Sequence, residues 1–256
     1  MHNLLSALLV DFFIQIVGFS LAITLQTEKF YDFAGSFTFI LLAQLSLRWN
    51  VRQSFRQVLV TSMVTIWALR LGGFLFYRVL LAGGDHRFDK VKTKPVTFFI
   101  YWMIQGVWVY VTVLPTLLLN NKKNYSQLSL QDYLGIAVWL TGFLIEVVAD
   151  WQKMAFRNNP DNTGKFISSG LWSISRHPNY FGEIVMWVGI FLVASTVFTG
   201  WEWLSIFSPM FVYYLLTNVS GIPILERSSM KRYGSLGSYK EYINNVPVLV
   251  PFIGSP

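Results

Sequence analysis

Long apolar segments dominate this sequence and constrain its fold more than any other feature. Seven of them approach the ~20 residues that a helix needs to cross a bilayer. They lie near Leu4–Leu25, Phe30–Leu47, Val58–Leu80, Val96–Leu119, Leu130–Trp151, Tyr180–Phe198 and Trp201–Ile222. Only 13% of the 256 residues are charged, whereas soluble domains carry about 25%. The sequence therefore predicts an all-α fold, a polytopic membrane helical bundle of about seven transmembrane helices in one membrane domain.

The distribution of Lys and Arg predicts the orientation of the bundle, because cytoplasmic loops carry an excess of these residues. Five of them fall on one side: Arg48, Arg52, Arg56, Lys122 and Lys123. Thirteen fall on the other: Lys29, Arg87, Lys90, Lys92, Lys94, Lys153, Arg157, Lys165, Arg176, Arg227, Lys231, Arg232 and Lys240. We therefore expect the N-terminus outside and the C-terminus in the cytoplasm.

The net charge of +7 fits this topology and an attraction to anionic membrane lipids. We expect no nucleic-acid binding, because no basic–aromatic surface appears outside the membrane segments. The expected location is an integral, multi-pass protein of the endoplasmic reticulum in a eukaryote, or of the inner membrane in a bacterium.

Several kinds of site are not expected from the residues present. The chain has no cysteine, and its three histidines, His2, His86 and His177, are too few for a histidine-rich metal site. Neither a G-x-G-x-x-G fingerprint after a strand nor a phosphate-binding P-loop motif occurs. A bound dinucleotide would therefore be held by helix ends and cytoplasmic loops.

Asp11, Arg70 and Glu146 are charged residues that lie inside apolar segments. Each costs roughly 2.5–3.5 kcal/mol to insert at the centre of a membrane helix, so each is expected to face the bundle interior. Two interpretations remain open. An ion pair such as Arg70 with Glu146 would hold helices in register, whereas a polar site inside the bundle would serve function.

The third segment carries an aromatic and basic stripe. Trp67, Arg70, Phe74, Tyr77 and Arg78 recur at helical spacing and share a face. Such a stripe is often simple helix packing, but two arginines make packing alone a poor explanation. We therefore take Trp67, Arg70 and Phe74 as candidate substrate-binding residues.

A polar stripe also closes the fifth segment. Glu146, Asp150, Lys153 and Arg157 are spaced four, three and four residues apart, which places them on one helical face. They predict either a salt-bridge ladder or a polar groove. In a groove, the acids would accept hydrogen bonds from ribose or amide groups, and the cations would pair with phosphate.

The stretch GLWSISRHPNYFGEIVMWVG, residues 170–189, gathers polar groups at the start of the sixth segment. Asn179, Glu183 and Trp187 repeat every four residues along one face. Arg176 precedes the helix start, where free backbone N–H groups favour an anion. His177 alone is equally compatible with a capping role.

This stretch resembles the signature of the steroid 5-alpha-reductase-like membrane family. EVVADWQKMAFR resembles the segment that precedes the signature, and YKEYINNVPVLVP resembles the C-terminal tail of that family. TEKFYDFAGSFTF and WALRLGGFLFYRVLLAGGDHRF are similar to N-terminal motifs of its uncharacterised branch. More distant members include sterol reductases and isoprenylcysteine carboxyl methyltransferases.

The resemblance implies NADPH-dependent reduction of a polarised carbon–carbon double bond in a lipophilic, steroid-, sterol- or lipid-like substrate. It implies a substrate side in residues 1–125 and a cofactor-binding half in residues 126–256. The cofactor-binding residues that the resemblance implies are Glu146, Asp150, Arg157, Asn179, Glu183, Trp187 and Arg227. The polar and basic pattern around them adds Lys153, Arg176, His177 and Tyr180 as candidates.

The steroid-contacting Glu and Tyr of the family have no clear counterpart here. Tyr31 with Asp32, or Tyr77, are the candidate catalytic residues that would supply the proton. Two alternatives remain: an S-adenosylmethionine-dependent membrane methyltransferase, and a non-catalytic membrane scaffold or lipid carrier. The cytoplasmic cations favour NADPH, because S-adenosylmethionine carries no phosphate.

Overall fold

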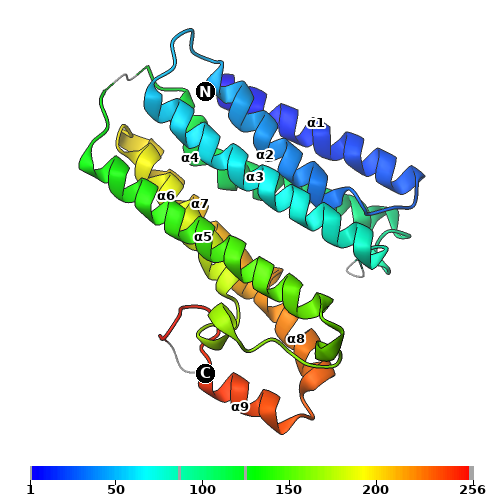
Figure 1. Ribbon diagram of the computed structural model, residues 1–256. Helices are drawn as coiled ribbons and strands as arrows, with labels where there is room; N and C mark the ends of the chain where they lie inside the picture. The colour runs from blue at the N-terminus through cyan, green and yellow to red at the C-terminus, as the bar shows by residue number, and fades with distance from the viewer. Residues whose placement is uncertain (1, 86–87, 124–125, 254–256) are drawn as a thin grey trace. The chain divides into compact units, whose positions relative to one another are not determined.

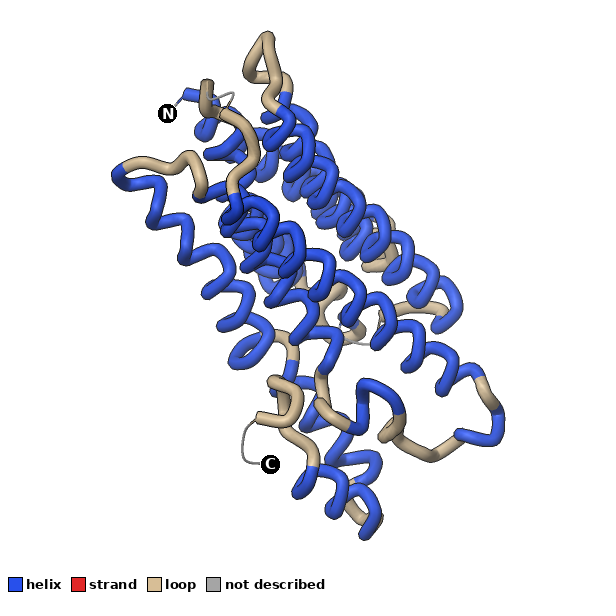
Figure 2. Tube along the Cα trace, turned by 60° about the vertical axis from the view of Figure 1, so that its left-hand side comes forward, coloured by secondary structure: helices blue, strands red, loops and turns tan. Residues whose placement is uncertain are grey.

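A computed structural model describes residues 2–85, 88–123 and 126–253. Within these ranges every regular element is helical, as Figure 2 shows. Figure 1 labels the α-helices: α1 His2–Thr24, α2 Tyr31–Leu47, α3 Phe55–Ala82, α4 Pro95–Asn120, α5 Leu130–Asn158, α6 Pro178–Ser195, α7 Phe207–Tyr214, α8 Ile222–Tyr233 and α9 Gly237–Asn245. Short 3₁₀ helices cover Pro160–Asn162, Gly170–Ser173 and Gly200–Ile206, and a π-helix covers Leu215–Val219.

Five of these helices, α1, α3, α4, α5 and α6, are long and apolar enough to cross a membrane. The chain is therefore a multi-pass membrane protein. The second predicted segment forms α2, which has only 17 residues. Arg87, one of the thirteen cytoplasmic charges expected from the sequence, lies outside the described residues.

The seventh predicted span, Trp201–Ile222, is not one continuous α-helix. Its first part is the 3₁₀ helix Gly200–Ile206, α7 has eight residues, and the π-helix precedes a non-helical Gly221. The chain thus changes helix type twice along this segment, from 3₁₀ to α and from α to π. Apolar composition alone concealed this change of period.

The described chain divides into two compact units. Unit 1 comprises Met1–Asp132 and Ile190–Ser208, and unit 2 comprises Tyr133–Gly189 and Pro209–Pro256. Residues 190–208 thus belong to unit 1, although they lie in the C-terminal half by sequence. In unit 1, helices α1 to α4 pack side by side (Figure 1), with Phe88, Phe98 and Trp102 in a buried aromatic cluster.

The polar residues buried in unit 1 bond to one another. Gln15 Nε2 donates to Asp11 Oδ1 at 3.0 Å, and Gln105 Nε2 donates to Gln15 Oε1 at 3.0 Å. Asp11 and Gln15 are completely buried. The hydrogen bond from the Gln15 amide therefore compensates part of the cost of placing Asp11 inside a membrane helix.

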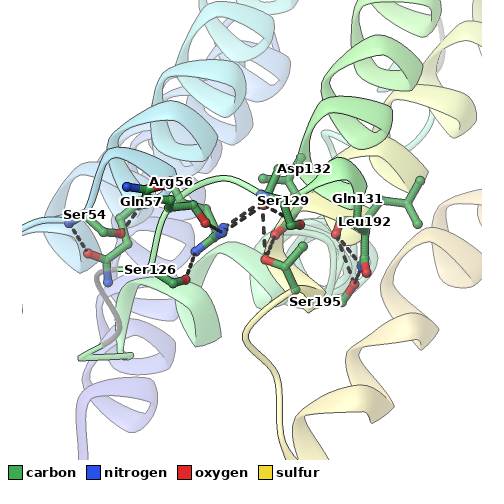
Figure 3. Close-up of polar contacts among 12 residues, drawn as sticks. Ser54, Arg56, Gln57, Ser126, Ser129, Gln131, Asp132, Leu192 and Ser195 are labelled. Carbon is green, nitrogen blue, oxygen red and sulfur yellow. Dashed lines mark hydrogen bonds and ion pairs between the residues drawn. The ribbon is translucent and has the colours of Figure 1, made fainter.

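Figure 3 shows a second buried polar cluster in unit 1 that the sequence did not reveal. Arg56 Nε and Nη2 bond to the two carboxylate oxygens of Asp132 at 2.7 and 2.8 Å. Their side chains are 2% and 0% exposed. Ser129 Oγ donates to the same carboxylate at 2.9 Å. Arg56, counted above as a loop charge, is therefore a buried residue in the first turn of α3.

Glycines bring α5 and α6 close together within unit 2. A Cβ atom added to Gly182 would lie 2.6 Å from the Gly142 carbonyl oxygen and 2.7 Å from the Glu146 amide nitrogen. A Cβ on Gly189 would lie 2.6 Å from the Trp139 amide nitrogen. These small residues let the two backbones touch, as at many membrane-helix interfaces.

The C-terminal tail binds the loop before α6 through main-chain groups. The Arg176 amide donates to the Pro247 carbonyl at 2.9 Å, and Ser175 Oγ donates to the Leu249 carbonyl at 2.7 Å. The Tyr242 hydroxyl donates to the Trp172 carbonyl at 2.7 Å. The tail thereby fixes the loop that carries Arg176 into α6.

Candidate functional site

Unit 2 contains a cavity of about 590 Å³ between the end of α5, the segment after it, α8 and α9. This volume is in the range of small-molecule sites, ~300–1,000 Å³. The described residues that line it are Lys153, Phe156, Arg157, Asn162, Thr163, Gly164, Lys165, Phe166, Ile167, Trp172, Arg176, His177, Leu225, Glu226, Ser228, Ser229, Arg232, Tyr233, Tyr239 and Tyr242.

The lining is strongly basic. Among the described lining residues are five cations and one carboxylate, that of Glu226. The cations are Lys153, Arg157, Lys165, Arg176 and Arg232. Guanidinium and ammonium groups clustered around one space favour an anionic ligand, above all one with phosphate groups.

Aromatic rings form another part of the lining. Phe166 contacts Tyr233, Tyr239 and Tyr242 with ring centroids 5.0 to 5.8 Å apart. Burial raises the pKa of both Tyr239 and Tyr242, so their hydroxyls stay protonated. The site therefore combines positive charge with planar apolar surface, as a heteroaromatic phosphate ligand requires.

Trp172 joins the aromatic and basic parts of the lining. Lys153 Nζ lies 4.4 Å from the centre of the Trp172 ring, close enough for a cation–π interaction. The indole nitrogen of Trp172 donates to the Ala149 carbonyl at 3.0 Å. The 3₁₀ helix Gly170–Ser173 is thereby held against α5.

Glu226 holds two residues of the lining at once. Arg176 Nη1 lies 2.9 Å from its Oε2, and His177 Nε2 lies 2.8 Å from its Oε1. Burial lowers the pKa of His177 and outweighs the attraction of Glu226, so the ring is neutral near pH 7. Burial would raise the pKa of Glu226, but His177 and the Arg176 charge together lower it. Glu226 is therefore ionised and accepts both bonds.

The predicted stripe on α5 divides along its length. Lys153 and Arg157 line the cavity, whereas Glu146 and Asp150 are buried and lie outside its lining. Asn179 Nδ2 donates to Asp150 Oδ1 at 3.1 Å, which joins α6 to α5 within unit 2. Asn179 Oδ1 is buried and has no hydrogen-bond partner among the described residues.

The other predicted cofactor residues take different positions. Arg176 and His177 line the cavity, and the Tyr180 ring lies parallel to the His177 ring with centroids 5.7 Å apart. Glu183 and Trp187 are buried on α6, outside the lining. Arg227 is exposed on α8 and also lies outside the lining.

The candidate catalytic and substrate residues lie in unit 1. The Tyr31 hydroxyl donates to the Tyr101 carbonyl at 2.8 Å, and Asp32 Oδ2 lies 3.8 Å from Arg78 Nη2. Tyr31 and Asp32, although adjacent on α2, therefore contact different residues. Tyr77 is 51% exposed.

The substrate-binding candidates on α3 differ in burial and contacts. Trp67 is fully buried against Phe39, with ring centroids 5.0 Å apart. The Arg70 guanidinium lies 5.4 Å from the centre of the Phe74 ring, within reach of a cation–π interaction.

Sequence reasoning did not single out Glu226, Phe166 or the aromatic residues of α8 and α9 as site residues, and it gave Arg232 and Lys165 no individual role in the site. Part of the signal was present, because Tyr239 and Tyr242 belong to the tail motif YKEYINNVPVLVP. Nothing in the spacing of Glu226 relates it to Arg176 and His177, which precede it by about fifty residues.

The fold and the cavity together define a helical, multi-pass membrane protein with a basic, aromatic-lined cavity. The chain belongs to the family described as "Protein of unknown function (DUF1295)", whose model matches residues 18–246. No solved structure matches the chain.

Curated relatives are similar at low identity. Human 3-oxo-5-alpha-steroid 4-dehydrogenase 1 is 28% identical over 120 residues, 47% of this chain and 41% of that protein. A probable O-methyltransferase of Ustilaginoidea virens is 31% identical over 98 residues, 38% of this chain and 32% of that protein. An uncharacterised Schizosaccharomyces pombe protein is 26% identical over 188 residues, 59% of this chain and 54% of that protein. The matches thus span about a third to a half of these relatives.

Proposed function

We propose that this protein is a membrane oxidoreductase that uses NADPH to reduce a polarised carbon–carbon double bond of a lipophilic substrate. The observation that carries the proposal is the cavity of unit 2, with five cations around a space of about 590 Å³ and an aromatic cluster beside them. The similarity to a 3-oxo-5-alpha-steroid 4-dehydrogenase supports the reaction class.

The residues present fit NADPH. Lys153, Arg157 and Arg176 line the cavity and would pair with its phosphates, with Arg232 and Lys165 on the same lining. Phe166 and the tyrosines around it offer planar surface to a base. Asn179 lies outside the lining, but its buried acceptor Oδ1 suits the carboxamide at the nicotinamide end, where the resemblance also puts Glu183.

In the proposed mechanism, bound NADPH supplies a hydride equivalent to one carbon of the double bond. The cations hold the phosphates, and Asn179, fixed by Asp150, orients the reactive end. Trp67, Arg70 and Phe74 contribute to substrate binding. Tyr31, beside Asp32, or Tyr77 donates the proton that completes the reduction.

A methyltransferase is the second candidate, because one relative is named a probable O-methyltransferase. S-adenosylmethionine is a cation without phosphate, and a cavity with five cations and one carboxylate suits it poorly. A non-catalytic scaffold or lipid carrier would bind neither cofactor.

Thermal unfolding of the purified protein in lipid nanodiscs tests these functions. NADPH at 100 times its Kd should stabilise the protein by about 2.7 kcal/mol, and NADH should stabilise it less. Steroid, sterol and long-chain enones would then be screened for loss of NADPH absorbance. Stabilisation by S-adenosylmethionine and not by NADPH would identify the methyltransferase instead, and stabilisation by neither would favour the scaffold.

A further inference from the structure

Glu226 is a carboxylate in a lining that otherwise favours anions. A negative charge among the cations repels phosphate, so by charge alone Glu226 weakens the binding that the cavity favours. We therefore looked for a favourable effect of Glu226 on the cavity that outweighs this repulsion. Its contacts with Arg176 and His177 indicate such an effect.

Both oxygens of Glu226 are engaged. One accepts from Arg176 at 2.9 Å and the other from His177 at 2.8 Å. The side chains of Arg176 and His177 are 10% and 5% exposed and that of Glu226 is 28% exposed, so these charge-assisted bonds are partly shielded from water. Such bonds are roughly twice as strong as neutral ones and fix the donors in direction.

The bond to His177 also decides where the imidazole carries its proton. An ionised carboxylate only accepts hydrogen bonds, so the proton lies on Nε2 and the neutral ring keeps a lone pair on Nδ1. His177 Nδ1 and Arg176 Nε are both buried and have no hydrogen-bond partner among the described residues. The parallel Tyr180 ring fixes the plane of the imidazole.

We propose that Glu226 is a positioning residue of the cavity: it holds Arg176 at the lining and fixes the His177 tautomer that leaves Nδ1 as an acceptor for an N–H or O–H group. The inference rests on the proposed function only where it takes the ligand to be NADPH. Charge and positioning predict opposite effects of removing the carboxylate. Loss of a negative charge alone would tighten NADPH binding, whereas loss of positioning weakens it.

Glu226→Gln separates the two effects, because an amide offers one acceptor oxygen where the carboxylate offers two. Arg176 or His177 then loses its partner, and we expect the NADPH Kd to rise at least about tenfold. Glu226→Asp, which keeps the charge but shortens the side chain, should also weaken binding, and it serves if Glu226→Gln does not fold. Glu241→Gln is the matched control, since it removes a charge from an exposed position on α9 and should change the Kd less than about twofold.

Nitrogen-15 NMR of histidine-labelled protein measures the tautomer without any cofactor, and a chain with three histidines simplifies the assignment. The wild type should show neutral His177 protonated on Nε2, and Glu226→Gln should lose this preference. An unchanged or lower Kd in Glu226→Gln overturns the proposal, whatever the tautomer does. If the wild type binds no NADPH but the tautomer still depends on Glu226, positioning stands and the proposed function falls.

Discussion

Asn179, in the first turn of α6, donates a 3.1 Å hydrogen bond to Asp150 on α5. The bond joins two polar stripes that the sequence predicted on different helices: Asp150 belongs to the stripe on α5, and Asn179 belongs to the stripe on α6. It also sets the direction of the Asn179 amide, since Nδ2 faces Asp150 and Oδ1 becomes the acceptor.

We expect Asn179→Ala and Asp150→Ala to be non-additive. A hydrogen bond to a charged acceptor is worth about 1.5–3 kcal/mol, so a double-mutant cycle should give a coupling of that order. Reversible unfolding of the four proteins in detergent measures it. Free energies that add within about 0.5 kcal/mol would contradict the contact.

The two arginines of α8 should differ in their effect on binding. Both side chains are exposed, but Arg232 lines the cavity whereas Arg227 lies outside the lining. Arg232→Gln should raise the NADPH Kd about tenfold or more, because a charge-assisted contact is lost. Arg227→Gln should change it less than about twofold. The opposite ranking in a binding titration would favour the site suggested by the family resemblance, which includes Arg227.

The close approach of α5 and α6 predicts a strong effect of a single methyl group. In Gly182→Ala the new Cβ would lie 2.6 Å from a backbone oxygen, so the helices must separate. We expect a loss of about 1–3 kcal/mol of stability, the usual cost of overpacking. Gly237→Ala is the control, because no atom lies within 4 Å of its Cβ position. Equal melting temperatures of the two variants would show that the glycine contact is not tight.

The lowered pKa of His177 predicts a loss of stability in mild acid. The unfolded chain takes up this proton near pH 6.5, whereas the folded chain resists it because the ring is buried beside Lys153 and Arg176. The contribution of neutral His177 to the free energy of unfolding is therefore complete above pH 6.5, and it falls as the pH decreases towards the folded-state pKa. Glu226, with its lowered pKa, stays ionised over most of this range.

Melting temperatures between pH 7.5 and 5.5 test this effect. His177→Gln should lose less stability on acidification than the wild type when the two proteins are compared in the same lipid. His2→Gln, at an exposed position on α1, should leave the loss unchanged. A wild-type melting temperature that rises towards pH 5.5 would mean that His177 is charged in the folded protein.

The proton donor of the proposed reaction can be assigned with two tyrosine variants. Loss of a general acid costs about 10²–10⁴-fold in turnover. Tyr31→Phe or Tyr77→Phe should therefore abolish most NADPH oxidation with an enone substrate, with an unchanged NADPH Kd. If both variants keep full turnover, neither tyrosine donates the proton.

The sequence predicted the features that depend on periodicity. The first six apolar segments appear as helices α1 to α6, and the stripe from Glu146 to Arg157 passes from buried to exposed along one face of α5. These successes have a simple cause, since helical spacing alone decides which residues share a face.

The features that sequence reasoning missed depend on tertiary contacts. The last apolar segment changes helix type along its length, which mean apolarity cannot indicate. Glu226 reaches Arg176 and His177 because chain segments distant in sequence meet around the cavity. The bidentate contact of Arg56 with Asp132 was missed because these residues are 76 positions apart.

The anchoring of the C-terminal tail has an evolutionary consequence. Two of its acceptors, the carbonyls of Pro247 and Leu249, belong to the main chain, which every amino acid provides. Homologous tails can therefore differ widely in side chains and still hold the loop before α6. They cannot readily differ in length, because one inserted or deleted residue between Tyr242 and Leu249 would shift these carbonyls out of register. Among relatives, we expect substitutions to be common in this segment and gaps to be rare.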